Sequence, residues 1–258
     1  MKVVLFCGGL GTRLREHSDT IPKPLVNIGY RPILWHLMRY YAHFGHNDFI
    51  LCLGYRGDLI REYFLNYKEC MSNDFVLSDG GKNIELLSRD LDNWRMTFVD
   101  TGLHSNIGQR LLRVRKYLDG EDVFLANYAD ALTDLALNEH VADFRSRSVV
   151  ASFLAVPTAQ SFHGVYSDDD GVVNAFGQMR DTDFWVNAGY FCLSREIFDY
   201  IEEGDELVEK PFQRLIMERR LAVFRYRGFW QQMDTFKDKI TYDRMEGRGE
   251  CPWMVWKY

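Results

Sequence analysis

Residues 2–14 have the sequence KVVLFCGGLGTRL, an apolar run that ends in a glycine-rich loop. The run is short and uninterrupted, as in a strand buried on both faces of a parallel sheet. Glycines let a backbone approach a ligand closely and leave amide N–H groups to bind an anion. Ligands of open α/β sheets bind at the carboxyl ends of strands, where this loop lies. We predict an anion-binding loop, although a plain turn remains an alternative, and its residues are Gly8, Gly9, Gly11, Thr12 and Arg13.

The loop departs from two common phosphate-binding patterns. No Gly-Lys-Ser/Thr follows the glycines, so it is not a Walker A loop. Leu14 stands where the Rossmann pattern Gly-x-Gly-x-x-Gly needs a third Gly or Ala. Its ligand must therefore be inferred from motifs elsewhere in the chain.

The rest of the chain alternates between strand and helix patterns. Apolar residues recur at helical spacing over 32–44, 58–67, 110–118 and 137–146. Apolar runs typical of strands occupy 48–53, 96–100, 122–128 and 149–156. This alternation predicts an α/β fold with a mostly parallel central sheet and helices on both faces. The second part adds a hairpin at 164–166 and 171–176, strands at 188–193 and 221–225, and helices at 195–202, 212–219 and 238–245.

Composition and charge narrow the class of protein. The 258 residues are 47% hydrophobic and carry a formal net charge of −6, which suits a globular core and argues against broad nucleic-acid binding. The apolar runs are too short to cross a bilayer, and the first one stops at Gly8-Gly9 without a cleavage site. The five cysteines are widely spaced and form no Cys-x-x-Cys pair. We expect reduced thiols in a cytoplasmic protein that binds neither nucleic acid nor membranes.

Two further motifs follow the glycine loop. Lys23 stands between Pro22 and Pro24, which predicts that it is presented from a stiff, extended segment. The second motif, Arg31-Pro32-Ile33-Leu34, opens a helix. The ordered set Gly-Gly-x-Gly-Thr-Arg, Lys-Pro-Leu and Arg-Pro-Ile-Leu resembles the pattern of sugar-1-phosphate nucleotidyltransferases.

The resemblance covers most of the chain and is closest in the first 135 residues. Within this family the chain is most similar to glucose-1-phosphate cytidylyltransferases, in segments 33–36, 54–57, 60–67, 100–102 and 228–235. The resemblance implies a Rossmann-like nucleotidyltransferase fold with a small β-rich extension on the substrate side. It also implies CTP as the donor and a homo-oligomeric enzyme of nucleotide-sugar synthesis. We expect a single domain, 1–258, with a nucleotide-binding half at 1–135 and an acceptor-binding half with the C-terminal segment at 136–258.

Two aspartates are candidate metal ligands. Asp130 follows the apolar segment Phe124 to Ala129 at the expected carboxyl end of a strand, and Asp234 lies far away in the sequence. Both match the metal-binding aspartates of the family. One or two carboxylates and the phosphate oxygens of a nucleotide are typical ligands of Mg²⁺. We predict that Asp130 and Asp234 hold Mg²⁺, while a helix cap or a solvated turn remains the alternative for each.

The implied reaction needs charge more than it needs a protein nucleophile. A phosphate oxygen of the acceptor attacks the α-phosphorus of the nucleotide, and pyrophosphate leaves. The attacking phosphate is already largely dianionic near neutral pH, because its second pKa is about 6. The protein must position two anions and stabilise the transition state. We assign that catalytic work to Arg13 and Lys23, which also bind the nucleotide.

Gly108-Gln109-Arg110 matches the segment that recognises the base in the family. Arg110 has the donors to bind the carbonyl oxygen of cytosine. The resemblance therefore adds Gly108 and Arg110 to the nucleotide site. An ordinary surface arginine at the start of a helix is the equally weighted alternative.

The acceptor side departs from the family. The usual Glu-Lys-Pro before the Asn-Gly-Gly strand is absent, and residues 176–181 read FGQMRD. We assign acceptor binding to Arg180, to Asn187 in Asn187-Ala188-Gly189, and to Lys210 in a later Glu-Lys-Pro. The aromatic stretch Phe184-Trp185-Val186 suggests an altered pocket, but for Trp185 itself we favour packing in the core. The acceptor is left open among glucose 1-phosphate, other sugar phosphates and non-sugar phosphates or phosphonates, and we favour one other than glucose 1-phosphate.

Two alternatives to a cytidylyltransferase remain open at this point. The chain could be a related transferase that uses UTP, dTTP or GTP, or a non-catalytic nucleotide-binding regulatory homologue. Intact Arg13, Lys23, Asp130 and Asp234 weigh against the regulatory alternative, and the absent lysine weighs for it.

Overall fold

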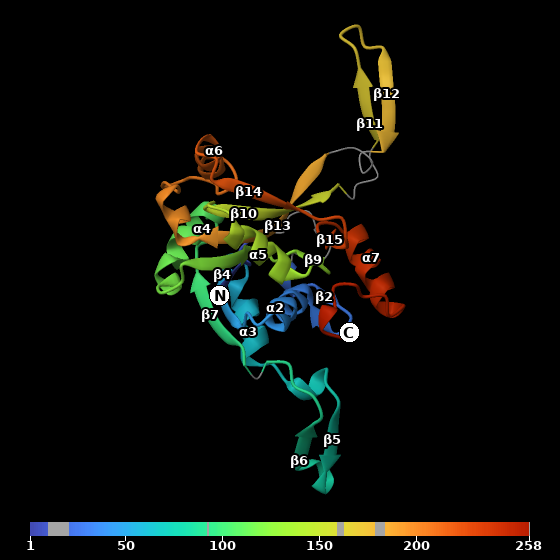
Figure 1. The fold of residues 1–258 in the computed structure, drawn as a ribbon. Helices are drawn as coiled ribbons and strands as arrows, with labels where there is room; N and C mark the ends of the chain where they lie inside the picture. The colour runs from blue at the N-terminus through green and yellow to red at the C-terminus, as the bar shows by residue number, and fades with distance from the viewer. Residues whose placement is uncertain (10–20, 92, 159–162, 179–183, 258) are drawn as a thin grey trace.

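A seven-stranded sheet runs through the middle of the molecule (Figure 1). The computed structural model describes residues 1–9, 21–91, 93–158, 163–178 and 184–257. The strand order is β14-β10-β13-β8-β1-β4-β7, in which β13 runs antiparallel to its neighbours β8 and β10. The mostly parallel sheet predicted from the sequence is therefore confirmed. Its strands are β1 (Val3–Phe6), β4 (Asp48–Leu53), β7 (Arg95–Asp100), β8 (Val123–Asn127), β10 (Ala151–Pro157), β13 (Trp185–Ser194) and β14 (Leu221–Arg225).

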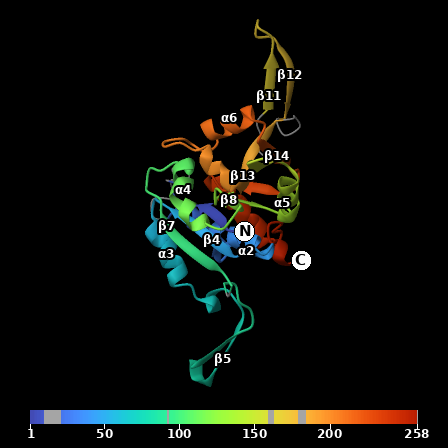
Figure 2. The same ribbon diagram turned by 60° about the vertical axis from the view of Figure 1, so that its left-hand side comes forward.

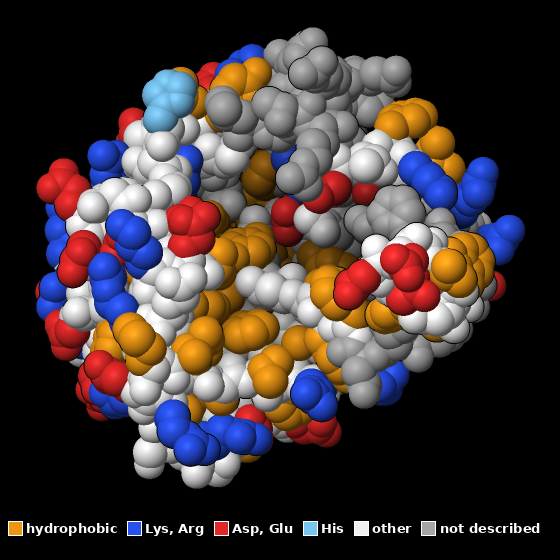
Figure 3. All heavy atoms as spheres, turned by 90° about the horizontal axis from the view of Figure 1, so that it is seen from above, with side chains coloured by type: hydrophobic (Ala, Val, Ile, Leu, Met, Phe, Trp, Pro, Cys, Tyr) orange, Lys and Arg blue, Asp and Glu red, His pale blue; other side chains and the backbone are white. Residues whose placement is uncertain are grey.

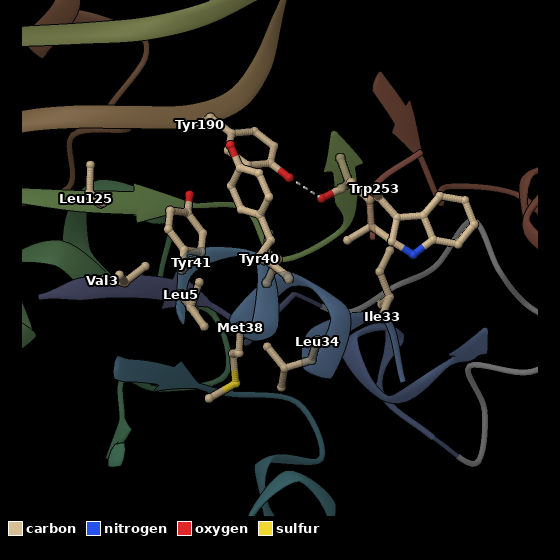
Figure 4. Close-up of a cluster of buried hydrophobic side chains, with 14 of the residues drawn as sticks. Val3, Leu5, Ile33, Leu34, Met38, Tyr40, Tyr41, Leu125, Tyr190 and Trp253 are labelled. Atoms are coloured by element: carbon tan, nitrogen blue, oxygen red, sulfur yellow. Dashed lines mark hydrogen bonds between the residues drawn. The ribbon is translucent and has the colours of Figure 1, made fainter. Parts of the chain in front are cut away.

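Helices cover both faces of the sheet because its strands are apolar on both faces. Along β1, Val3 and Leu5 enter one hydrophobic cluster, whereas Val4 and Phe6 enter a second. The first cluster contains the aromatic group shown in Figure 4, with Tyr40, Tyr41 and Tyr190. This first cluster packs under helices α2 (Ile33–His43), α3 (Gly57–Leu65), α5 (Leu137–Ser146) and α7 (Phe236–Gly247). The second cluster packs under helices α4 (Ile107–Val114) and α6 (Lys210–Met217) on the other face.

Two hairpins project from opposite ends of the molecule (Figures 1 and 2). The first consists of β5 (Phe75–Ser78) and β6 (Asn83–Leu86), and the second of β11 (His163–Ser167) and β12 (Val173–Gln178). The sequence predicted the second hairpin and missed the first. Both carry exposed apolar side chains and lack the one-sided alternation typical of a half-buried strand. The second was predicted instead from the acidic turn at residues 167–170 between its strands. The exposed set is Phe75, Val76, Leu77, Ile84, Val165, Tyr166, Val173 and Phe176.

Two short pairings, which the sequence did not predict, shape the carboxyl edge of the sheet. β2 (Asn27–Ile28) pairs with β3 (Arg31–Pro32), immediately before α2. β9 (Ala131–Thr133) pairs antiparallel with β15 (Trp230–Gln232). The second pairing joins segments about 100 residues apart and places Asp130 beside Asp234.

Several boundaries differ from those predicted. Helix α4 begins at Ile107 rather than at residue 110, because Asn106 caps it by accepting a hydrogen bond from the Gln109 amide. The segment predicted as a helix over 195–202 is a 3-10 helix, η7 (Arg195–Asp199). The other 3-10 helices among the described residues are η2 (Lys23–Leu25), η3 (Glu69–Met71), η4 (Asp79–Gly81), η5 (Arg115–Leu118) and η8 (Val255–Lys257).

The prediction that Lys23 lies in an extended segment was wrong, because the residue begins η2. Pro22 is extended, but Pro24 occupies a first-turn position, where its missing N–H has no helical partner to lose. Lys23 is thus presented from a tight turn instead of a strand-like stretch. All five cysteines are free, and within the described residues no helix is long and apolar enough to cross a membrane.

Candidate active site

A cavity of about 340 Å³ lies at the carboxyl ends of β1 and β8. Viewed from above, this side of the molecule is hollowed, and acidic and hydrophobic side chains are visible inside (Figure 3). Because parallel strands bring their carboxyl ends to one edge, the loops after β1 and β8 meet here. The described residues that line the cavity are Phe6, Gly9, Ser105, Asn106, Ile107, Arg110, Tyr128, Asp130 and Glu206.

Three charged side chains converge at the edge of this cavity. The Nζ atom of Lys23 lies 2.9 Å from Oδ2 of Asp130 and also donates a hydrogen bond to Asp234. The backbone holds the two aspartates together, since the Met233 amide donates to the Asp130 carbonyl over 2.8 Å. Three residues that are remote in the sequence therefore form one cluster.

The conformation of the neighbouring backbone helps to present Asp130. Ala129 has a φ of 61°, which is uncommon for a residue other than glycine. Its amide donates a hydrogen bond of 2.7 Å to the side chain of Asn127, which holds this conformation in place. The turn directs the chain out of β8 and into β9, with Asp130 between them.

Burial and charge act in opposite directions in this cluster. Burial raises the pKa of Asp130 above its ordinary value, and the adjacent Lys23 ammonium opposes that rise. Burial would lower the pKa of Lys23, but Asp130 and Asp234 more than offset it and raise the pKa. The ammonium therefore stays charged, and each buried charge depends on the others.

Arg110 lies beneath the glycine loop and is almost completely buried. Its guanidinium donates to the Gly8 carbonyl over 2.9 Å, to the Leu53 carbonyl over 3.1 Å and to the Thr101 hydroxyl over 2.7 Å. A Cβ on Gly8 would lie 2.1 Å from Arg110 Nη1, so a larger residue there would have to displace the guanidinium. The alternative of an ordinary surface arginine was wrong, and the guanidinium holds the loop after β1 against the loop after β4.

The other predicted residues lie at different distances from the cavity. Asn187, on β13, accepts a hydrogen bond from the Gly189 amide and donates to the hydroxyl of Tyr128, which lines the cavity. Gly108 packs against the Asp205 carbonyl, where a Cβ would lie at 2.2 Å. Lys210 is mostly exposed at the start of α6, 3.7 Å from Asp205, and does not line the cavity. Gly11, Thr12, Arg13 and Arg180 lie outside the described residues.

Sequence reasoning missed four polar residues that line the cavity, Ser105, Asn106, Tyr128 and Glu206. Two of them, Tyr128 and Glu206, carry ionisable side chains. Glu206 accepts hydrogen bonds from the amides of Ile107 and Leu207, and burial raises its pKa above the ordinary value. Neither residue lies in a motif that marks a site. The position of Tyr128 two residues before Asp130 was a signal that could have been used.

The fold is that of a nucleotidyltransferase, and the comparisons with known proteins agree. The nucleotidyl transferase family model matches residues 2–240, and the chain belongs to that family. Its relatives at 36% identity over their full length include glucose-1-phosphate cytidylyltransferases. It is 36% identical to the "Probable glucose-1-phosphate cytidylyltransferase" of Bacillus subtilis (strain 168), covering 99% of this chain and 100% of that protein. It is also 36% identical to the glucose-1-phosphate cytidylyltransferase of Salmonella typhi, over 100% of both chains.

Among solved structures, UDP-glucose pyrophosphorylase complexed with UDP-glucose superposes with a TM-score of 0.71 at 13% identity. That superposition covers 96% of this chain and 98% of the other, and it establishes the shared fold. The resemblance stated from the sequence is thereby confirmed, together with the nucleotidyltransferase fold.

Proposed function

We propose that this protein transfers CMP from CTP to a phosphorylated small molecule and releases pyrophosphate. The observation that carries the proposal is the convergence of Lys23, Asp130 and Asp234 beside the cavity that Gly9 lines. The choice of CTP is supported by the full-length similarity to cytidylyltransferases. The acceptor is a sugar 1-phosphate or a non-sugar phosphate or phosphonate.

The two aspartates suit the metal that we propose. Enzymes of this family generally use a divalent metal. Asp130 and Asp234 each bring a carboxylate to the same edge of the cavity, and hard cations such as Mg²⁺ prefer such oxygen ligands. When bound, Mg²⁺ would neutralise charge on the triphosphate and on the leaving pyrophosphate.

Lys23 is well placed to bind phosphate oxygens. Its ammonium is charged and held at the cavity edge by two carboxylates, so it is oriented before the nucleotide arrives. A preoriented cation stabilises the charge that develops on the phosphates in the transition state without reorganising. Arg13 would act beside it as a second cation. Gly8, Gly9, Gly11 and Thr12 would supply backbone and hydroxyl donors, and Arg110 and Gly108 would form the wall on the side of the base.

The acceptor would enter from the half of the chain that contains β13. Asn187 is held by Gly189 and Tyr128 at the boundary of the cavity, where it can bind a hydroxyl or phosphate oxygen. We retain Arg180 and Lys210 as proposed acceptor contacts. The nucleotide-binding half at 1–135 and the acceptor-binding half at 136–258 would then act as one domain around a shared sheet.

We also propose that the protein is a homo-oligomer in the cytoplasm. The apolar residues exposed on the β5–β6 and β11–β12 hairpins form surfaces that a second copy would cover. Five free cysteines suit a reducing compartment.

A screen for pyrophosphate release tests the function. Purified protein with Mg²⁺ is incubated with CTP, UTP, dTTP or GTP, each against a panel of phosphorylated acceptors. We expect release with CTP and at least one acceptor. Absence of release with every pair would contradict the proposal and favour a non-catalytic role.

A further inference from the structure

Two arginines flank one tryptophan on the acceptor side, outside the cavity described above. The guanidinium carbon of Arg227 lies 4.8 Å from the centre of the Trp185 ring, and that of Arg225 lies 5.4 Å from it. Both arginines are exposed, and within the described residues neither forms a salt bridge with a carboxylate. Among the described residues, therefore, no carboxylate neutralises the two like charges beside this ring.

A third donor in the same cluster also lacks an acceptor. The Nε1 atom of Trp185 is buried, and it has no hydrogen-bond partner in the described part of the chain. A buried indole N–H normally finds a partner, because leaving it unpaired costs free energy. Two guanidinium groups and one indole N–H thus share an environment that an oxyanion would satisfy.

The sheet places this cluster beside the acceptor side of the active site. Asn187 on β13 and Arg225 on β14 both pair with Ala155 of β10, so they stand in one row across the sheet. Trp185 precedes Asn187 by two residues and therefore shares its face of β13. Asn187 contacts Tyr128 of the cavity.

The distance between Arg225 and Asn187 indicates which group of the acceptor could reach the arginines. Neighbouring strands lie about 4.8 Å apart, so the backbone of Arg225 stands roughly 10 Å from that of Asn187. The attacking phosphate must instead lie beside the nucleotide, near Lys23 and Asp130. One strand, β10, separates Arg225 from Asn187, and neither arginine lines the cavity, so the pair suits a group of the acceptor away from the reacting phosphate.

We propose that Arg225, Arg227 and the indole N–H of Trp185 form a subsite for a second oxyanion of the acceptor. This inference rests on the proposed function and narrows its acceptor to phosphorylated metabolites that carry a further carboxylate, phosphate or phosphonate away from the attacking phosphate. The anion neutralises the two guanidinium groups and accepts the unpaired indole hydrogen.

Steady-state kinetics with matched acceptors test the subsite. Glucose 1-phosphate is compared with glucose 1,6-bisphosphate and with glucuronic acid 1-phosphate, at saturating CTP and Mg²⁺. We expect KM at least about tenfold lower for an acceptor with the second anion, since charge-assisted hydrogen bonds are roughly twice as strong as neutral ones. The double variant Arg225→Gln/Arg227→Gln should lose that advantage and keep the KM for CTP.

Two further variants sharpen the result. Trp185→Phe keeps the ring and removes the N–H, so it should lose part of the advantage. Arg115→Gln is the matched control, because Arg115 is another exposed arginine over a ring, 5.2 Å from the centre of Phe198, at the start of η5. It should leave every KM unchanged.

The outcomes separate this inference from the function on which it rests. Turnover with equal KM for all three acceptors, or an advantage that survives in the double variant, overturns the subsite and leaves the function standing. A double variant that changes its sedimentation but not its KM assigns the pair to a subunit interface and overturns the subsite as well. If no acceptor is turned over, calorimetric titration of glucose 1,6-bisphosphate decides: equal affinity for wild type and double variant overturns the subsite, and a loss of about tenfold or more supports it.

Discussion

The cluster around Lys23 and the cluster around Trp185 are both rich in charge, yet they are built in opposite ways. Lys23 forms salt bridges with Asp130 and Asp234, so its charge is paired with carboxylates, and its side chain is largely buried. Arg225 and Arg227 are exposed, and Trp185 offers them a ring but no negative charge. Lys23 is thus paired with two carboxylates before any ligand arrives, whereas among the described residues no carboxylate pairs with Arg225 or Arg227. We infer that a ligand neutralises the charge on the acceptor side.

The largest expected effect comes from removing a charge from the cluster of Lys23, Asp130 and Asp234. Asp130→Asn should lower turnover by about 100-fold or more, because the amide cannot replace a carboxylate as a ligand of Mg²⁺ and leaves Lys23 with one partner. Initial rates of pyrophosphate release at saturating Mg²⁺ measure it. Asp48→Asn, which breaks a surface salt bridge with Arg95, is the control and should change little. Near-normal turnover of Asp130→Asn would remove Asp130 from the metal site.

The next effect concerns the stability of the two halves against acid. Burial lowers the pKa of His36, on α2, and of His140, on α5, to about 4. Both values lie below the unfolded value of 6.5, so the unfolded chain takes up protons first as the pH falls. Stability that is fully present above pH 6.5 is therefore lost between 6.5 and 4, by about 3 kcal/mol for each histidine.

Chemical denaturation at a series of pH values measures this loss. His36 belongs to the first half of the chain and His140 to the second. Because we expect both halves to unfold as one domain, acid should lower the midpoint of a single cooperative transition. His36→Gln and His140→Gln should each flatten the pH dependence. Two separate transitions would show that the halves unfold independently and would contradict the single domain.

The prediction from sequence succeeded where local pattern and tertiary structure agree. The central strands are apolar runs, and helices α2 and α5 were placed within one residue of their observed ends. It failed where the structure depends on partners remote in the sequence. Nothing local marks Ala131–Thr133 or Trp230–Gln232 as a paired ladder, although this ladder joins the two aspartates. The exposed β5–β6 hairpin was missed for a related reason, since no buried face imposes a pattern on it.

The candidate site shows the same division. Lys23, Asp130 and Asp234 were chosen from motifs, and the structure brings all three together. Tyr128 and Glu206 line the same cavity without belonging to a motif, so only the fold reveals them. Trp185 had been weighed mainly as a core residue. Of its two arginines, Arg225 ends a strand whose neighbours could not be foreseen, and Arg227 follows that strand.

A smaller effect should follow from crowding the loop that Arg110 supports. Gly8→Ala places a methyl group 2.1 Å from the Arg110 guanidinium, and displacing that group breaks its bonds to backbone carbonyls. We expect a loss of about 1–3 kcal/mol in the free energy of unfolding, as for other overpacked sites. Gly9→Ala is the matched control, because a Cβ there meets no atom within 4 Å. Equal stability of the two variants, measured by urea unfolding, would mean that the guanidinium yields without cost.

The smallest effect that we predict is the preference for CTP over UTP. It tests whether the nucleotide side of the site also selects the base. The two bases share one carbonyl, but cytosine has an amino donor where uracil has a second carbonyl acceptor. Because the Arg110 guanidinium already donates to Gly8, Leu53 and Thr101, discrimination should depend on an acceptor near Arg110 that pairs with the amino group. One buried partner of this kind is worth roughly 1–3 kcal/mol in kcat/KM.

Arg110→Gln should lower kcat/KM with both nucleotides, because it releases the loop at Gly8, and should preserve the ratio of the two values. Competition between CTP and UTP in one reaction, with the products separated by chromatography, gives the ratio directly. Equal efficiencies in the wild type would contradict base selection at this site, and a ratio that collapses in Arg110→Gln would show that the guanidinium itself distinguishes the bases.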